Sequence, residues 1–262
     1  MTVLATILES KAREVARLKE QNDVHALREA AEAAAPGRDL VQAIRDCPGV
    51  PVIAEIKRRS PSAGTLREVP DPTELARSYV AAGAVGISVL TDSEFFGGNI
   101  QDLVAVRRAV DAPLLRKDFI MDPVQLYEAK LAGADAVLLI VAALAQPILQ
   151  QLADQCRELQ MTPVLEIHGE GEIDRALAVN PALIGINNRN LMTLEVSLGP
   201  ALKLSGLLPS GVLVLAESGI QHPRDITLLR TAGVDAFLVG TCLMRSDDPA
   251  EQLRQLIAAE AG

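Results

Sequence analysis

Short apolar runs alternate with longer amphipathic stretches from residue 51 onward. Each run is rich in Val, Ile and Leu, which is typical of strands that are buried on both faces of a parallel sheet. The stretches between the runs have the length and apolar spacing of helices. The predicted strands are 52–57, 86–91, 113–118, 135–142, 163–168, 183–188, 212–218 and 236–241.

A repeat at a spacing of about 50 residues supports this division. It consists of "AAGAVGISVL" at residue 81, "LAGADAVLLI" at 131, "VNPALIGINN" at 179 and "TAGVDAFLVG" at 231. Each copy has a helix end, a turn and a buried strand, and units of about 25 residues then fill residues 51–250. Eight strand–helix units predict a closed (β/α)8 TIM barrel. An open doubly wound sheet usually has fewer parallel strands and often carries GxGxxG after the first one, which is absent here.

Residues 1–48 precede the barrel. Their sequence predicts a helical extension that ends at the "PGRD" and "CPGV" breaks. No low-complexity linker interrupts the chain, so we expect one domain over residues 1–262. The N-terminus lacks the apolar core and cleavage site of a signal peptide. The apolar run at 136–145 is about half as long as a membrane span, so we expect no contact with a membrane.

Charge and cysteine content narrow the classes of partner. The formal net charge is -9 and aromatic residues make up 2% of the chain, which argues against nucleic acid as a ligand. Cys47, Cys156 and Cys242 lie far apart without metal-ligand spacing, so we expect neither a disulfide framework nor a metal site. This cysteine usage favours a reducing, cytoplasmic location. Protein partners cannot be inferred from these features.

Polar side chains gather at the carboxyl ends of the predicted strands. The side-chain period of two places Glu55 and Lys57 on the same face as Ile53, pointing to the barrel mouth. A single residue of this kind would fit a structural ion pair equally well. A whole set on one rim favours an active site, because burying it costs more stability than apolar residues would. The same test adds Lys117, Glu166, Asn187, Glu217 and Ser218, and places His168 at most behind them, without contact with the ligand.

Small residues follow the last two predicted strands, in "AESGI" at 216–220 and "LVGTCLM" at 238–244. Backbone N–H groups at this position of a barrel often bind phosphate. Gly219 and Gly240 would permit close approach, and Ser218 and Thr241 would add hydroxyl donors. The pair of motifs predicts a phosphorylated ligand.

Seven motifs in order give a resemblance to a known family. They are "VIAEIKRRSPSAG", "LTDSEFFGG", "LLRKDFI", "VLEIH", "IGINNRNL", "AESGI" and "LVGTCLM". Together they resemble the indole-3-glycerol phosphate synthase family over the whole chain. The resemblance implies a lyase of tryptophan biosynthesis that needs neither metal nor organic cofactor. Its reaction closes a ring in 1-(o-carboxyphenylamino)-1-deoxyribulose 5-phosphate, with loss of carbon dioxide and water, to give indole-3-glycerol phosphate.

The resemblance also implies roles for single residues. Lys117 would protonate the ribulose carbonyl oxygen, while its strand neighbours Arg116 and Asp118 face away from the mouth. Glu166 would act in the later acid and base steps with Lys57 as the second cation, and the sequence leaves open how Lys57 and Lys117 divide them. The remaining assignments are Glu55 and Asn187 for orientation, Glu217 and Ser218 for the sugar and phosphate, Ser60 and Arg189 for the anthranilate carboxylate, and Phe96 and Phe119 for its ring.

Three positions depart from many relatives, which have Lys at Ala63, Asp at Asn190 and Ser at Cys242. Arg58 and Arg59 are either a local source of positive charge for the ligand or part of a solvated loop.

Other functions of the protein stay open as well: a phosphoribosyl anthranilate isomerase, a Schiff-base lyase that uses Lys117, or a noncatalytic regulatory barrel that binds phosphate. Against these, the first strand lacks an isomerase's Cys or Asp base, and both lysines are present.

Overall fold

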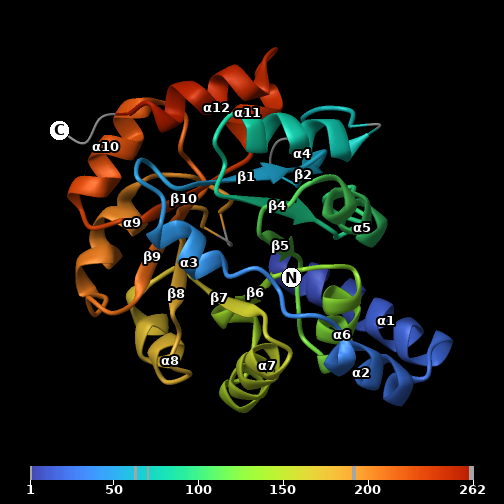
Figure 1. The fold of residues 1–262 in the computed structure, drawn as a ribbon. Helices are drawn as coiled ribbons and strands as arrows, with labels where there is room; N and C mark the ends of the chain where they lie inside the picture. The colour runs from blue at the N-terminus through green and yellow to red at the C-terminus, as the bar shows by residue number, and fades with distance from the viewer. Residues whose placement is uncertain (1, 62–63, 70, 191–192, 260–262) are drawn as a thin grey trace.

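In the computed structural model, which describes residues 2–61, 64–69, 71–190 and 193–259, eight parallel strands form a closed barrel (Figure 1). Neighbouring strands pair in chain order, and the last strand closes the barrel against the first, with Val52 opposite Phe237. The predicted (β/α)8 barrel is confirmed. The barrel strands are β1 (Val52–Ile56), β4 (Gly86–Leu90), β5 (Leu114–Lys117), β6 (Ala136–Ile140), β7 (Thr162–Ile167), β8 (Leu183–Asn187), β9 (Leu213–Glu217) and β10 (Ala236–Val239).

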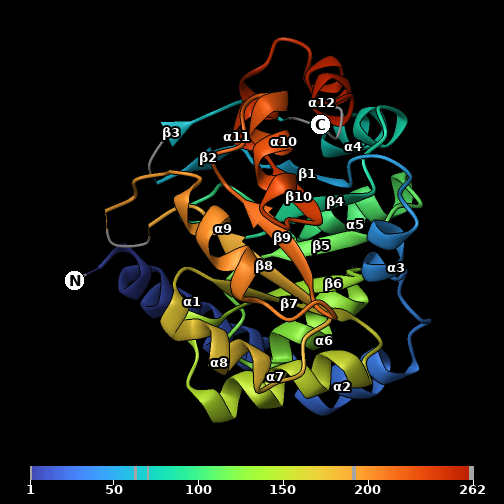
Figure 2. The ribbon, with the colours of Figure 1, turned by 90° about the vertical axis from the view of Figure 1, so that its left-hand side faces the viewer.

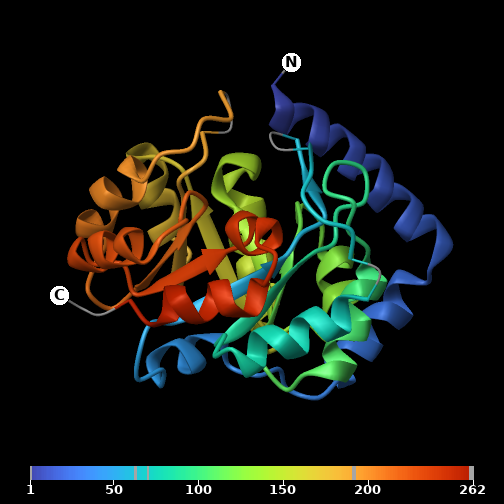
Figure 3. The same cartoon turned by 90° about the horizontal axis from the view of Figure 1, so that it is seen from above.

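Helices follow the strands and form the outer ring (Figure 3). Several of them begin with an acidic or amide N-cap whose side chain accepts a backbone hydrogen bond, as Asp71 and Asn99 do. The helices are α4 (Pro72–Ala81), α5 (Ile100–Ala109), α6 (Pro123–Leu131), α7 (Gln146–Glu158), α8 (Ile173–Leu177), α9 (Gly199–Leu204), α10 (Pro223–Thr231), α11 (Thr241–Arg245) and α12 (Pro249–Ile257). The shorter elements are the 3-10 turns η1 (Val141–Ala143), η2 (Glu170–Glu172) and η3 (Ser205–Leu207), and the hairpin of β2 (Arg59–Ser60) with β3 (Gly64–Thr65).

The N-terminal segment contains three helices, α1 (Val3–Gln21), α2 (Val24–Ala33) and α3 (Leu40–Arg45). Figure 2 shows α3 at one end of the barrel and the hairpin of β2 and β3 at the other, which α1 also approaches. Leu40 and Ile44 of α3 belong to the apolar cluster of the barrel interior, so this helix closes the amino end of the strands. The carboxyl end is therefore the open mouth.

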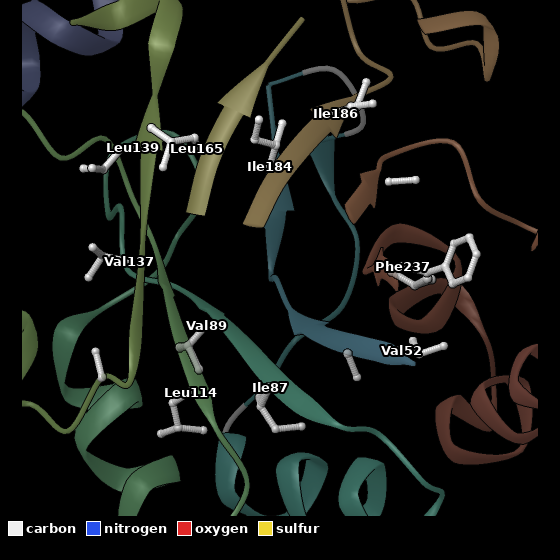
Figure 4. Packing of buried hydrophobic residues seen from close by; sticks show 14 of the residues in the cluster. Val52, Ile87, Val89, Leu114, Val137, Leu139, Leu165, Ile184, Ile186 and Phe237 are labelled. Carbon is white, nitrogen blue, oxygen red and sulfur yellow. The ribbon is translucent and has the colours of Figure 1, made fainter. Parts of the chain in front are cut away.

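Two buried apolar layers stabilise the barrel. Outward side chains of the strands, such as Ile87, Leu114 and Val137, pack in the layer beneath the helices (Figure 4). Inward side chains such as Ile53 and Leu115 fill the interior toward its closed end. Side chains alternate along a strand, so the inward series of β1 continues from Ile53 to Glu55 at the mouth.

Candidate active site

A cavity of about 510 Å³ lies at the carboxyl ends of the strands. This volume is in the range of small-molecule sites. Every residue that the sequence predicted for catalysis or ligand contact lines the cavity, and His168 does not: the lining includes Glu55, Lys57, Ser60, Phe96, Lys117, Phe119, Glu166, Asn187, Arg189, Glu217, Ser218, Gly219, Gly240 and Thr241. The structure therefore brings together residues from all parts of the barrel, while their chemical roles stay predictions.

Lys117, the last residue of β5, lies between two buried carboxyl groups. Its Nζ is 3.2 Å from Oε2 of Glu166 and 3.4 Å from Oε2 of Glu217. Burial alone would lower the pKa of Lys117, but Glu166, Glu217 and Glu55 outweigh it and raise this pKa above its usual value. The ammonium group is thus held charged at the centre of the mouth.

The two carboxyl groups beside Lys117 differ in protonation. Burial raises the pKa of Glu166, but the positive charges of Lys117 and His168 outweigh it and hold that pKa below its usual range. Burial and the charge of Glu166 raise the pKa of Glu217 to about 8. At neutral pH Glu166 is ionised and Glu217 carries a proton. A pair of carboxyl groups whose pKa values are pushed apart is typical of acid and base catalysis.

Glu55 of β1 and Lys57, which directly follows β1, form an ion pair with each other at the same mouth. Glu55 is buried, and the space for its carboxylate exists because residue 240 is a glycine: a Cβ there would overlap Oε2 of Glu55. Gly185 on β8 makes room for Glu217 in the same way. Gly240 was predicted to contact the phosphate, and it is also needed to leave space for the Glu55 carboxylate. Gly185 was not among the predicted site residues.

The turn after β9 adopts an unusual backbone conformation at the cavity. Ser218 and Gly219 have φ angles of 64° and 85°, in the left-handed region that is costly for a serine. Asn188 supports this turn, because its side chain donates a hydrogen bond to the carbonyl oxygen of Ser218 and accepts one from the N–H of Ala201. Strain at a loop that lines a cavity is typical of functional sites.

Two phenylalanine rings form one wall of the cavity. The centroids of Phe96 and Phe119 are 6.0 Å apart, with an angle of 38° between the ring planes. Asp92 accepts a hydrogen bond from the N–H of Phe96 at 3.2 Å, and Asp118 accepts one from the N–H of Phe119 at 2.8 Å. These two aspartates therefore fix the backbone that carries the rings.

The same aspartates bind the N-terminal segment. Lys11 of α1 is 1% exposed, and its Nζ lies 2.8 Å from Oδ1 of Asp118 and 3.1 Å from Oδ2 of Asp92. Arg116 also pairs with Asp118. Arg116 does not line the cavity, as predicted, but Asp118 does, so the expectation that Asp118 faces away from the mouth is wrong. Val3, Leu4 and Ile7 of α1 line the cavity. The helical extension thus completes the site, which the sequence analysis did not predict.

The first two arginines after β1 do not supply charge to the cavity. Arg58 pairs with Asp102 and donates to the carbonyl oxygen of Val69, and Arg59 donates to that of Ser93 at 2.9 Å. Of the two alternatives left open for these arginines, the structure favours the second, because neither lines the cavity and their guanidinium groups stabilise neighbouring loops. Ala63, one of the departures from the family pattern, lies outside the described residues.

Other lining residues were also missed. The phosphate end of the predicted site also includes Gln221 and His222, at the start of α10, together with Arg245 and Gln252.

The structure also bears on metal binding, thiols and membrane spans. Among the described residues, no group of three or more His, Cys, Asp or Glu side chains could hold a metal ion. The three cysteines are free thiols. No helix in the described parts of the chain is long and apolar enough to span a membrane.

A closed parallel barrel with lysines and carboxylates at its mouth defines the class of (β/α)8-barrel enzymes. The family model described as indole-3-glycerol phosphate synthase matches residues 4–256. The protein named indole-3-glycerol phosphate synthase from Kineococcus radiotolerans is 47% identical over all of this chain and 97% of its own length. Proteins of the same name are 46% identical in Mycobacterium sp. (strain KMS), over 98% of this chain and 94% of the relative, and in Rhodococcus jostii, over 100% and 97%. The chain belongs to the indole-3-glycerol phosphate synthase family.

Proposed function

We propose that this protein is an indole-3-glycerol phosphate synthase, a carboxy-lyase of tryptophan biosynthesis. It converts 1-(o-carboxyphenylamino)-1-deoxyribulose 5-phosphate to indole-3-glycerol phosphate, carbon dioxide and water. Membership of the family over nearly the whole chain supports this reaction. The observation that carries it is the position of Lys117, a largely buried cation between an ionised and a protonated carboxyl group at the barrel mouth.

Ring closure requires an acid at the ribulose carbonyl. A ring carbon of the anthranilate moiety attacks the carbonyl carbon, and Lys117 delivers a proton to the oxygen as negative charge develops there. Carbon dioxide then leaves from the attacking ring carbon, which restores the aromatic benzene ring. The new hydroxyl takes up a proton and departs as water, and loss of a proton from the new five-membered ring completes the indole. Glu166 is ionised and thus suited to accept that proton. Lys57 is the second cation of the site, and its pairing with Glu55 fixes its position.

The remaining lining residues bind the substrate. Phe96 and Phe119 pack against the anthranilate ring, and Ser60 and Arg189 receive its carboxylate. Asn187 and Glu217 bind sugar hydroxyls; apart from its contact with Lys117, the Glu217 carboxyl has no hydrogen-bond partner among the described residues. The phosphate binds at the loops after β9 and β10, where Ser218, Gly219, Gly240 and Thr241 lie.

We also propose how this enzyme sits in the cell. The net charge of -9 and the free thiols support a cytoplasmic protein that binds neither nucleic acid nor membranes. The whole chain would act as one domain, with residues 1–48 as an extension of the barrel.

The direct test is turnover of the carboxyphenylamino-deoxyribulose phosphate by the purified protein, followed by the appearance of indole fluorescence. The assay runs without added metal and in the presence of EDTA, and full activity is expected there. Loss of activity in EDTA would overturn the prediction that no metal is needed. Tight binding without turnover would instead favour a noncatalytic regulatory barrel. Covalent trapping of the substrate on Lys117 by borohydride would favour a Schiff-base lyase.

A further inference from the structure

His168 lies directly behind Glu166 and is not among the described residues that line the cavity. It follows the last residue of β7 and is separated from Glu166 by one residue, so the two side chains leave the strand on the same side. Its Nε2 is 3.3 Å from Oε1 of Glu166. Both side chains are largely buried, with exposed fractions of 12% for the imidazole and 2% for the carboxylate.

A second carboxylate holds the other edge of the imidazole. Nδ1 of His168 is 3.7 Å from Oε2 of Glu172, at the end of the turn η2. The same Glu172 oxygen accepts a hydrogen bond from the backbone N–H of His168 at 2.8 Å. The ring is thereby fixed between two negative groups, which favours its protonated form.

The Glu166 carboxylate consequently has a cation at each oxygen. Lys117 of β5 lies 3.2 Å from Oε2, and His168 lies at Oε1. The nearby Glu217 of β9 carries a proton at neutral pH, because burial and the charge of Glu166 raise its pKa. Lys117 must also give up its proton during ring closure if the proposed mechanism is correct, and for that moment His168 would be the remaining cation beside Glu166.

Burial would lower the pKa of His168, but the Glu166 and Glu172 carboxylates beside the ring outweigh it and raise this pKa to about 10. The geometry and this shift agree: the imidazole stays charged at neutral pH. An ordinary buried histidine that serves packing alone would be neutral and paired through one nitrogen.

We propose that His168 is a positioning residue that keeps Glu166 ionised and oriented toward the substrate throughout the reaction. The proposal rests on the proposed function, in which Glu166 is the base. His168 acts through Glu166 and makes no contact with the substrate itself. Its replacement should therefore alter the pH dependence of the reaction before it alters the affinity for substrate.

The first test needs no substrate and is a titration of the histidine ring protons by NMR. The chain has three histidines, and spectra of His168→Asn and His25→Asn assign the signals. In the unmodified protein the His168 signal should not titrate between about pH 6 and about pH 8.5, whereas a free imidazole titrates near 6.5. Replacement of its partner in Glu172→Gln should bring the titration closer to that range. A midpoint near 6.5 in the unmodified protein would overturn the proposal.

The second test is the pH profile of kcat/KM for His168→Asn, which keeps a hydrogen-bond donor but removes the charge. Loss of a neighbouring cation raises the pKa of Glu166. The acid limb of the profile, which is the fall of kcat/KM at low pH, should therefore move to higher pH by about one unit. Near pH 8, where Glu166 is ionised in either protein, kcat and KM should stay within about three-fold. The control His25→Asn removes an exposed imidazole that also faces a glutamate, Glu29, and its profile should match the unmodified protein.

The outcomes separate the proposal from the function on which it rests. An unmodified protein without turnover would contradict the proposed function, while the NMR titration would still report on the His168 charge. An active protein whose acid limb is unchanged in His168→Asn would overturn the positioning role alone. An equal loss of kcat/KM at every pH would also overturn it, because that result indicates a structural role. If His168→Asn does not fold, Glu172→Gln carries the same test and should shift the limb in the same direction by a smaller amount.

Discussion

At the scale of single residues, both predicted catalytic lysines are neutralised by partners within the protein. Lys57 pairs with Glu55, and Lys117 lies between Glu166 and Glu217. Burying such charges is costly, and well-packed apolar residues would stabilise a barrel interior more. The ion pairs fix the lysines in place before the substrate arrives, so little reorganisation is needed when charge develops in the transition state.

The protonated state of Glu217 predicts a pH dependence of stability. Its pKa is about 8 in the folded protein against an ordinary value of 4.5, so between these values the folded state binds more protons than the unfolded state. The free energy of unfolding should therefore fall as pH rises through this window. The Glu217→Gln variant keeps the shape of the uncharged carboxyl side chain, but its amide group does not titrate. Urea unfolding at about pH 5, 6, 7 and 8 should show the unmodified protein losing stability relative to this variant; parallel curves would refute the assignment.

At the scale of secondary-structure elements, α1 is joined to the barrel by a buried charge cluster. Lys11 contacts Asp92 and Asp118, and each aspartate binds the backbone of a phenylalanine that lines the cavity. Val3, Leu4 and Ile7 of the same helix lie at the mouth. The helix is thus part of the site wall as well as an outer covering.

Removal of the Lys11 charge should destabilise the protein strongly. Lys11→Met keeps the length of the side chain but removes the cation that buried Asp92 faces and leaves buried Asp118 with Arg116 alone; breaking a buried ion pair typically costs about 3–5 kcal/mol of unfolding free energy. Lys19→Met is a matched control on the same helix, because Lys19 is 45% exposed in its pair with Asp122. An exposed pair contributes at most about 1 kcal/mol. Equal losses in urea unfolding of the two variants would contradict the role of the buried cluster.

These elements also indicate what a sequence alone can predict. The strands and the side chains that line the mouth follow from local periodicity, because alternation along a strand determines which residue faces inward. The roles of Lys11, Gly185 and His168 depend on contacts with Asp118, Glu217 and Glu172, and only the folded chain brings the first two pairs together. The choice between the two alternatives for Arg58 and Arg59 stayed open for the same reason, since their partners Asp102 and Ser93 lie more than 30 positions away.

At the scale of the whole molecule, the fold separates stability from chemistry. The α3 helix and the apolar interior close one end of the barrel, and the polar ends of the strands meet at the other. Charged groups from distant parts of the sequence can share one cavity because parallel strands all end on the same side. Family membership and this geometry support the same reaction.

The most direct measurement is the turnover number of Lys117→Ala in the indole fluorescence assay. Loss of the acid should lower kcat by at least about 100-fold, while circular dichroism shows a folded barrel. Lys203→Ala is the control, because Lys203 is an exposed lysine paired with Glu170 outside the cavity, and its turnover should match the unmodified protein. Near-normal turnover in Lys117→Ala would contradict the account of this site.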